Sequence, residues 1–350
     1  MIGKWLEALG EDGPVYGEGT VAHFGDPKGE NAAARDERVI SPLPDTAVVR
    51  ASGEDALSFL HGQLSNDVQG LAAGRWQLDA YCTPKGRTLA LLELWRDGDD
   101  LLVKLPATLA EATLKRLRMF VLRSKVQFEA LDWIACGLAG PGAAEALAGA
   151  ALPVPEGDRG AAAAGGLWVL ARPGPGERFE LTGPTGAVAA AWAGLREAGA
   201  RPVGSGRWAW LDIRAGWPRL HPGTAELWVP QMINLDLIDG IHFKKGCYPG
   251  QEIVARTKYL GKLKQRMLPA HADTEDIPPP GTKLHAASMG AQAAGQVVEA
   301  QAAPEGGCDL LAVLRLSVKE EALHLGAPDG PAVKLAAPPY PVPELAGGEE

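Results

Sequence analysis

The chain has 350 residues, of which 46% are hydrophobic and 22% charged, and its formal net charge at pH 7 is −9. This length exceeds one ordinary hydrophobic core and predicts two or three domains, and the composition argues against extensive disorder. The acidic balance disfavours a general nucleic-acid binder, because such proteins usually present a broad basic face.

The first part of the chain predicts an arm followed by an α+β unit. Residues 1–45 are interpreted as an N-terminal arm that opens with a short helix. A regular pattern starts at residue 46, where Ser52 and Asp55 resemble the capping residues of a helix that ends at 66–67. The predicted elements of this unit, residues 46–130, are strand 47–50, that helix, hairpin 77–82 and 88–95, strand 101–105, helix 107–120 and strand 124–129.

Residues 131–265 predict a second unit with the same order of elements. These are strand 133–138, helix 143–150, strands 167–171 and 178–181, helix 187–198 and strand 208–213, with a surface excursion at 151–166. Helices inserted among paired strands in this order are typical of two ferredoxin-like α+β units.

Residues 266–345 predict a small C-terminal β-barrel. Pro278-Pro279-Pro280-Gly281 marks a turn, and short apolar stretches follow at regular intervals, which is typical of a compact all-β fold. They lie at 295–298, 310–316, 322–325 and 332–335. We expect the tail at 346–350 to be loose.

The run from Phe243 to Arg256 combines residues that suggest thiol chemistry. Glycines and a proline bracket Cys247, and residues 251–256 predict a helix. A cysteine just ahead of a helix N-terminus, beside Lys244 and Lys245, would favour its thiolate. The alternative is a small buried cysteine within a glycine-shaped turn. Lys245 would either lower the pKa of the thiol or bind a ligand carboxylate.

Charge and cysteine placement narrow the choice of ligand. Seven basic residues and one acid lie between Lys244 and Arg266, which predicts either a patch for an anionic ligand, RNA or partner, or a solvated loop. The four cysteines form no CxxC pair, so we expect no self-contained metal centre.

Since the sequence shows neither a signal peptide nor a run of about 20 apolar residues, we expect a cytoplasmic protein.

The run Lys-Gly-Cys-Tyr-Pro-Gly-Gln-Glu at 245–252, with Val254-Ala255-Arg256, resembles the signature of the YgfZ family. These folate-binding proteins are relatives of the glycine-cleavage T-protein and act in iron–sulfur cluster assembly or repair and in tRNA modification. The resemblance extends to residues 230–235 and more loosely to 52–68 and 121–126. It implies a T-protein-like fold that holds tetrahydrofolate or a related folate in a central cavity between the domains.

Several side chains are candidates for this folate. The resemblance assigns Trp208 to the ligand, although Trp208 and Trp210 on one strand face would also suit a core. Asn66 and Asp67 would bond the pterin edge or form a helix C-terminal turn, and Asn234 with Asp236 presents the same choice. The remaining candidates are Lys245, Gln251 and Arg256.

Three functions follow from these observations. The first is a folate-dependent accessory factor that uses Cys247 to serve iron–sulfur client or assembly proteins, with tRNA-modifying enzymes as further partners. The second is a one-carbon transferase of the T-protein type, and the third a thiol hydrolase or acyltransferase with His242, His221 or His61 as base. We favour the first, because only it couples a reactive thiol to folate, and an ordinary enzyme is not expected.

Overall fold

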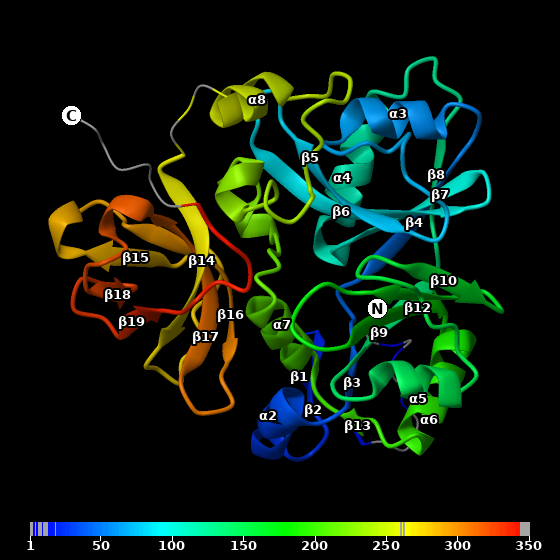
Figure 1. Ribbon diagram of the computed structural model, residues 1–350, viewed down its shortest axis with the longest axis horizontal. Helices are drawn as coiled ribbons and strands as arrows, with labels where there is room; N and C mark the ends of the chain where they lie inside the picture. Colours follow the sequence, from blue (N-terminus) through cyan, green and yellow to red (C-terminus); the bar gives the residue numbers. More distant parts are fainter. Residues whose placement is uncertain are drawn as a thin grey trace. The chain divides into compact units, whose positions relative to one another are not determined.

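The computed structural model describes residues 3, 5, 9, 13–17, 19–259, 261 and 263–343 (Figure 1). The described chain forms two compact units. Unit 1 holds the residues up to Phe59, Gln69–Gln77 and Glu93–Leu211, and unit 2 holds Leu60–Val68, Leu78–Leu92 and the residues from Asp212 onward. The division passes through helices and strands, so it does not test the four predicted domain boundaries, which stay a prediction.

Unit 1 contains a six-stranded sheet in the order β10-β11-β12-β9-β3-β13. All neighbours are antiparallel except β13 and β3, which run parallel. The predicted strands at 133–138, 167–171 and 178–181 are confirmed, whereas β3, β10 and β13 were missed. The bounds are β3 Val39–Pro42, β9 Trp133–Ala139, β10 Ala161–Ala164, β11 Leu167–Ala171, β12 Arg178–Pro184 and β13 Arg201–Pro202.

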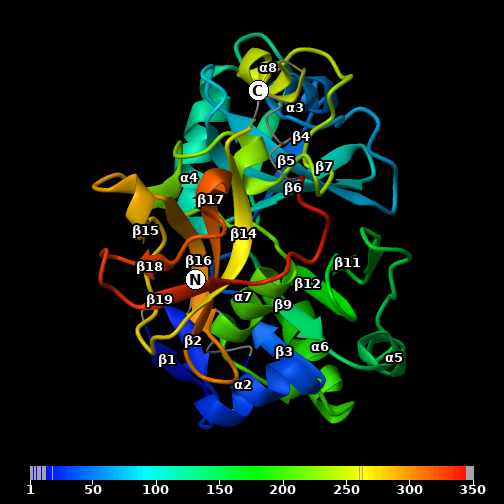
Figure 2. The same ribbon diagram turned by 60° about the vertical axis from the view of Figure 1, so that its left-hand side comes forward.

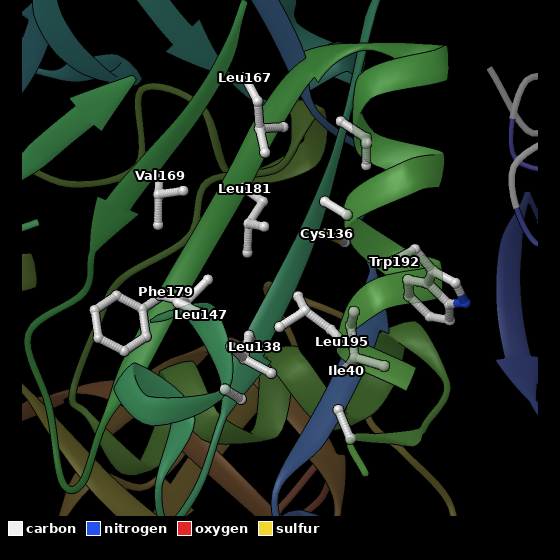
Figure 3. Packing of buried hydrophobic residues seen from close by; sticks show 14 of the residues in the cluster. Ile40, Cys136, Leu138, Leu147, Leu167, Val169, Phe179, Leu181, Trp192 and Leu195 are labelled. Atoms are coloured by element: carbon white, nitrogen blue, oxygen red, sulfur yellow. The ribbon is translucent and has the colours of Figure 1, made fainter. Parts of the chain in front are cut away.

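The core of unit 1 lies between this sheet and two helices, α5 (Ala143–Gly149) and α6 (Thr185–Glu197) (Figure 3). Cys136 and Leu138 of β9 are two apart and therefore point to the same face, where Trp192 and Leu195 of α6 meet them. Fully burying such a side chain contributes about 1.5–3 kcal/mol. Burial also raises the pKa of the Cys136 thiol far above its ordinary value, so this cysteine serves packing.

A five-stranded sheet has the order β5-β6-β7-β4-β8. The chain passes through β4, helix α3, β5, β6, β7, helix α4 and β8, which is the ferredoxin-like alternation predicted for this segment. Each of its predicted elements is confirmed, with small shifts at the ends. The bounds are β4 Ala47–Ser52, α3 Ala56–Gln63, β5 Trp76–Cys82, β6 Thr88–Asp97, β7 Asp100–Leu105, α4 Ala107–Met119 and β8 Gln127–Ala130.

The strand predicted at 208–213 was wrong, because the segment forms helix α7 (Ser205–Arg214). Residues two apart on a helix point about 200° away from each other, so Trp208 and Trp210 do not share a face. Trp208 packs so closely on β9 that a Cβ on Gly137 would stand 2.1 Å from its Cε3. The Arg178 guanidinium lies 4.8 Å from the centroid of the same ring. These contacts stabilise the helix, although aromatic residues by themselves favour β-strands.

The N-terminal segment contributes buried side chains, among them Trp5, Leu9 and Val21, to the core of unit 1. It forms β1 (Val15–Gly17), β2 (Thr20–His23) and α2 (Pro27–Asp36). Glu30 of α2 is buried, and its carboxylate accepts the N–H groups of Phe24 at 2.6 Å and Gly204 at 2.9 Å. Of the helix predicted at the start, only residues 3, 5 and 9 are described, and these are helical.

Four charged side chains form a buried cluster in unit 1. Lys104 Nζ lies 2.7 Å from Glu93 Oε2 and 2.5 Å from Glu180 Oε2. Arg172 donates to both oxygens of Glu93, at 2.5 and 2.7 Å. The four residues come from β6, β7, β12 and the end of β11, so they link the five-stranded sheet to the six-stranded one within this unit. We call them the ionic cluster.

Unit 2 contains a closed six-stranded barrel, as predicted, in the order β14-β17-β16-β15-β18-β19 (Figure 2). Its interior is filled with small and aliphatic side chains such as Leu310 and Leu314 of β17. Residues 344 and 345 of the predicted barrel domain and the tail at 346–350 lie outside the described residues. The bounds are β14 Gln265–Ala272, β15 Lys283–Ala286, β16 Gly295–Ala302, β17 Cys308–Arg315, β18 Leu323–Leu325 and β19 Ala332–Leu335.

None of the helices in the described part of the chain is long and apolar enough to cross a membrane.

Candidate functional site

The Lys-Gly-Cys-Tyr-Pro-Gly-Gln-Glu motif lies in unit 2 and forms a loop, the motif loop (residues 243–250), that leads into α8 (Gln251–Tyr259). The predicted helix after the cysteine is therefore confirmed. The loop packs on the turn between β5 and β6. A Cβ on Gly250 would stand 2.5 Å from Thr83 O and 2.7 Å from Gly86 Cα, and Gly250 has a φ of 84°. Only glycine fits such a contact at this backbone angle.

Lys245 anchors the other side of the motif loop. Its Nζ donates hydrogen bonds to the carbonyl oxygens of His61 and Leu64, the latter at 2.6 Å. These carbonyls belong to the C-terminal end of α3, where helix carbonyls lack partners and the helix dipole is negative. The ammonium also lies 5.2 Å from the Tyr248 ring centroid. Lys245 thus caps α3, a contact that the two roles predicted from sequence did not include.

Burial lowers the pKa of Lys245 to about 8, although the nearby carboxylates of Asp79 and Asp67 act in the opposite direction. The side chain therefore remains mostly protonated at pH 7. Asp79 lies on β5 and is fully buried. An acid within the otherwise apolar run 78–82 is the sequence signal for this buried carboxylate.

Cys247 is exposed, whereas Cys82, Cys136 and Cys308 are buried. Burial raises the pKa of Cys82 to about 12 and that of Cys308 to about 11. Cys247 is thus the accessible thiol among the four cysteines, all of which are described. The alternative of a buried structural cysteine at this position is wrong, while the expected thiolate stays a prediction.

His61, near the C-terminal end of α3, lies beside the motif loop. Its Nδ1 is 3.2 Å from Asp67 Oδ1, and its Nε2 is 3.7 Å from the point where a Cβ on Gly246 would stand. Of the other two histidines considered as bases, His221 pairs through its ring Nε2 with Glu299 Oε2 at 2.7 Å. The backbone N–H of His242 donates to Ser65 O at 3.0 Å. Sequence spacing had not distinguished among the three.

The Asn66 side chain is fully engaged within unit 2. Its Nδ2 donates to Leu78 O at 3.0 Å and to Asp239 O at 2.7 Å, and its Oδ1 accepts the Asp67 N–H at 2.9 Å. The Asn66 N–H in turn donates to Asp79 at 2.8 Å. These bonds fasten the turn after α3, which ends at Gln63 rather than at 66–67. They favour the structural alternative for Asn66 over a pterin contact.

Asn234 also holds the backbone together, at the end of the 3₁₀-helix η3 (Pro230–Ile233). Its φ is 61°, and its Nδ2 donates to Met267 O of β14 at 2.7 Å. Its Oδ1 is buried and has no hydrogen-bond partner among the described residues. Asp236 receives two hydrogen bonds from Arg266, at 2.6 and 2.9 Å.

The predicted basic patch is smaller than expected. Arg266 is buried and forms an ion pair with Asp236, and Lys245 caps α3, so neither side chain contributes to a surface patch. Lys258 Nζ lies 3.6 Å from the Phe243 ring centroid. Lys262 lies outside the described residues. The exposed cations that remain are Lys244, Arg256, Lys258 and Lys264.

The predicted site residues fall into two groups. Unit 2 holds Lys245, Cys247, Asn66, Asp67, Gln251, Arg256 and Asn234. Gln251 supports the motif loop, because its Nε2 donates to Lys245 O at 3.4 Å. Trp208 lies in unit 1 and is buried there. Its role toward a ligand stays a prediction.

Two further features of the described residues bear on ligands. No group of three or more histidine, cysteine, aspartate or glutamate side chains among them is arranged to hold a metal ion. An open hollow of about 820 Å³ lies in unit 1 between Asp55–Phe59 and Phe120–Ser124. It contains none of the predicted site residues.

Comparison with known proteins finds relatives whose sequences are similar to this chain. No family model matches the sequence. The chain is 33% identical to the tRNA-modifying protein YgfZ of Edwardsiella ictaluri over 304 residues, covering 85% of this chain and 91% of that protein. It is 32% identical to YgfZ of Pectobacterium carotovorum over 256 residues, covering 72% of this chain and 76% of the other.

A solved structure agrees at the level of the fold. The glycine cleavage system aminomethyltransferase T of Bartonella henselae matches with a TM-score of 0.81 and 18% identity, over 96% of each chain. The T-protein-like fold with its barrel is thereby confirmed. Together with the identities above, this shows that the chain belongs to the YgfZ family of tRNA-modifying proteins.

Proposed function

We propose that the protein is a folate-binding accessory factor for iron–sulfur cluster assembly or repair, and that Cys247 is its working thiol. Its part in tRNA modification is then indirect, through iron–sulfur enzymes that modify tRNA. The observation that carries the proposal is the exposed thiol in a loop fixed on both sides. Lys245 ties one end to α3, and Gly250 seats the other against the β5–β6 turn. A fixed, accessible thiol is suited to exchange reactions.

The proposal of folate binding rests on the family resemblance and on polar and charged side chains that could bind a folate. A pterin presents N–H donors, and the Oδ1 of Asn234 and the Oε1 of Gln231 are buried acceptors without a partner among the described residues. Exposed Lys244 and Arg256 offer cations for the glutamate tail of a folate. Asn66 fits less well, since both of its amide protons are already donated.

Calorimetric titration of the full chain with tetrahydrofolate tests the proposal. We expect saturable binding, and we expect Lys245→Ala to weaken it about tenfold because the motif loop loses its anchor. Lys264→Ala removes an exposed lysine from the same basic stretch and should leave the affinity unchanged. Absence of binding at millimolar tetrahydrofolate would remove the folate claim.

A glycine-cleavage assay on the same preparation separates the accessory factor from the aminomethyltransferase alternative, which has only the likeness of fold in its favour. Folate binding without turnover is the expected result. Formation of methylenetetrahydrofolate from the aminomethyl donor would instead establish the transferase.

A further inference from the structure

A group of exposed apolar side chains lies at the end of α4, in unit 1. Met119, Phe120 and Leu122 are 67%, 43% and 87% exposed. The other exposed large hydrophobic side chains of the described residues are far apart in the sequence. Single exposed apolar side chains are normal on a protein surface, but a contiguous group of them marks an interaction site. The function proposed above gives this group no part.

The backbone at Leu122 is strained. Its φ is 44°, in the left-handed region that residues with bulky side chains rarely adopt. Glycine would fit this turn without strain. Burial does not repay the strain either, because the leucine side chain is almost wholly exposed. A strained residue that packing does not explain points to a function at that position.

The open hollow of about 820 Å³ lies directly beside these side chains, since Phe120 and Leu122 are part of its wall. The opposite wall includes Asp55 and Phe59. The backbone of Lys125 joins the two walls, because its N–H donates to Asp55 Oδ2 at 2.7 Å and its carbonyl accepts the Asp55 N–H at 3.2 Å. The hollow is therefore held in shape by the fold, which reduces the cost of ordering it when a partner binds.

The charges around the hollow are positive, in a chain whose net charge is −9. Segment 115–125 contains five basic residues and no acid. Two of the five are engaged by neighbouring groups of the chain. Lys115 and Arg123 are exposed and have no hydrogen-bond or ion-pair partner among the described residues. Lys115 lies one helical turn before Met119, and Arg123 lines the hollow.

We propose that this surface docks an acidic segment of a partner protein. We call Lys115, Met119, Phe120, Leu122 and Arg123 the docking surface. A bulky apolar side chain of the partner enters the hollow, and its carboxylates pair with the two unpaired cations. Methionine, aromatic residues and arginine are enriched at protein interfaces, and complementary charges at the rim speed association. The inference goes beyond the function proposed above and does not rest on it.

Two other kinds of partner suit the docking surface less well. Single-stranded RNA binds by stacking its bases on exposed aromatic rings, whereas the two most exposed side chains here, Met119 and Leu122, carry no ring. A lipid surface takes up a protruding apolar tip but offers no side chain to fill a hollow. A polypeptide supplies both an anchoring side chain and nearby carboxylates.

A random peptide library displayed on phage tests the inference with a defined probe. The library is selected on the immobilised full chain and depleted on the double variant Leu122→Asp, Arg123→Glu, so that only clones that depend on the docking surface remain. We expect these clones to combine aspartate or glutamate with a large apolar or aromatic residue. Recovery of no such clone, or of clones without acidic residues, would overturn the inference.

The selected sequence is then synthesised as a labelled peptide and titrated by fluorescence anisotropy. Leu122→Asp should weaken its binding at least about tenfold, as is typical when an interface hot spot is lost. Arg123→Glu should weaken it about fivefold at low ionic strength and less at about 1 M salt, because salt screens exposed charges. Val154→Asp is the matched control, at an exposed apolar residue elsewhere in unit 1, and should leave the affinity unchanged.

Leu122→Gly separates docking from folding. Glycine adopts a φ of 44° without strain, so the thermal unfolding temperature should be no lower than that of the wild type. The affinity for the peptide should nevertheless fall about tenfold, because the apolar side chain is lost. A variant that loses stability together with affinity would show that Leu122 serves packing and would refute the inference.

An oligouridylate of about ten nucleotides and vesicles of phosphatidylglycerol are titrated in parallel. Binding of either that Leu122→Asp abolishes would assign the surface to RNA or to lipid and overturn the inference of a peptide partner. None of these measurements uses folate, Cys247 or an iron–sulfur enzyme. Failure of this inference and failure of the proposed function are therefore distinguishable.

Discussion

Replacing Arg172 by methionine is expected to lower the free energy of unfolding by about 3–5 kcal/mol, the cost typical of breaking a buried ion pair. Arg172 donates two hydrogen bonds to Glu93 and lies 4.0 Å from Glu180. Without it, two buried carboxylates share Lys104 alone. Urea unfolding followed by tryptophan fluorescence measures the change. Arg123→Met, at an exposed arginine, is the control and should shift stability by less than about 0.5 kcal/mol.

The effect of Arg172→Met should depend on pH. Burial by itself would raise the pKa of Glu93, but Arg172 and Lys104 together lower it to about 2. A carboxyl with a depressed native pKa contributes its full stabilisation above its unfolded pKa of about 4.3 and loses it as the pH falls toward the native value. The difference between wild type and variant should therefore shrink between about pH 4.5 and 2. A difference that is constant over this range would contradict the pairing.

Replacing Cys247 by serine is expected to abolish maturation of an iron–sulfur enzyme while leaving the protein folded and its tetrahydrofolate affinity unchanged. The side chain is exposed and makes no hydrogen bond with a described residue, so its loss removes chemistry and no packing. The measurement is the activity of an iron–sulfur enzyme from cells in which the variant replaces the wild type.

Cys308→Ala is the control for this prediction. It deletes a buried thiol inside the barrel, so we expect lower stability but retained maturation for the folded fraction. Wild-type maturation with Cys247→Ser would show that the thiol has no role and would leave the folate as the part to explain.

The sequence predicted most of the architecture because its periodic segments are long. The helices at 107–119 and 185–197 and the strands around 88–97 and 308–315 have unambiguous apolar patterns. The failures have a common cause, which is that contacts from elsewhere in the chain decided the outcome. Two-residue β13 exists because β3 offers it a partner. Segment 205–214 is a helix because Trp208 packs on Gly137.

The sequence predicted only part of the candidate site. The motif identified Cys247 and its preceding lysine, because residue types at fixed spacing carry local chemistry. It could not show that Lys245 caps a helix whose end lies 181 residues earlier in the chain, or that Asp67 and His61 meet beside Gly246. Those relations depend on how the loop docks. For the same reason, spacing could not show that Arg266 is buried and paired with Asp236.

The contact between Gly250 and Gly86 links two parts of the sequence that look independent. Both have positive φ, and a Cβ on Gly86 would stand 2.9 Å from the Ile253 Cβ of α8. Even alanine at position 86 would thus push on the helix that follows the thiol. In a mutational scan scored only for thiol activity, substitutions in the β5–β6 turn, more than 150 residues away, should therefore lower activity about as strongly as substitutions in the motif itself. Chimaeras made by random recombination between homologues should need both glycines together.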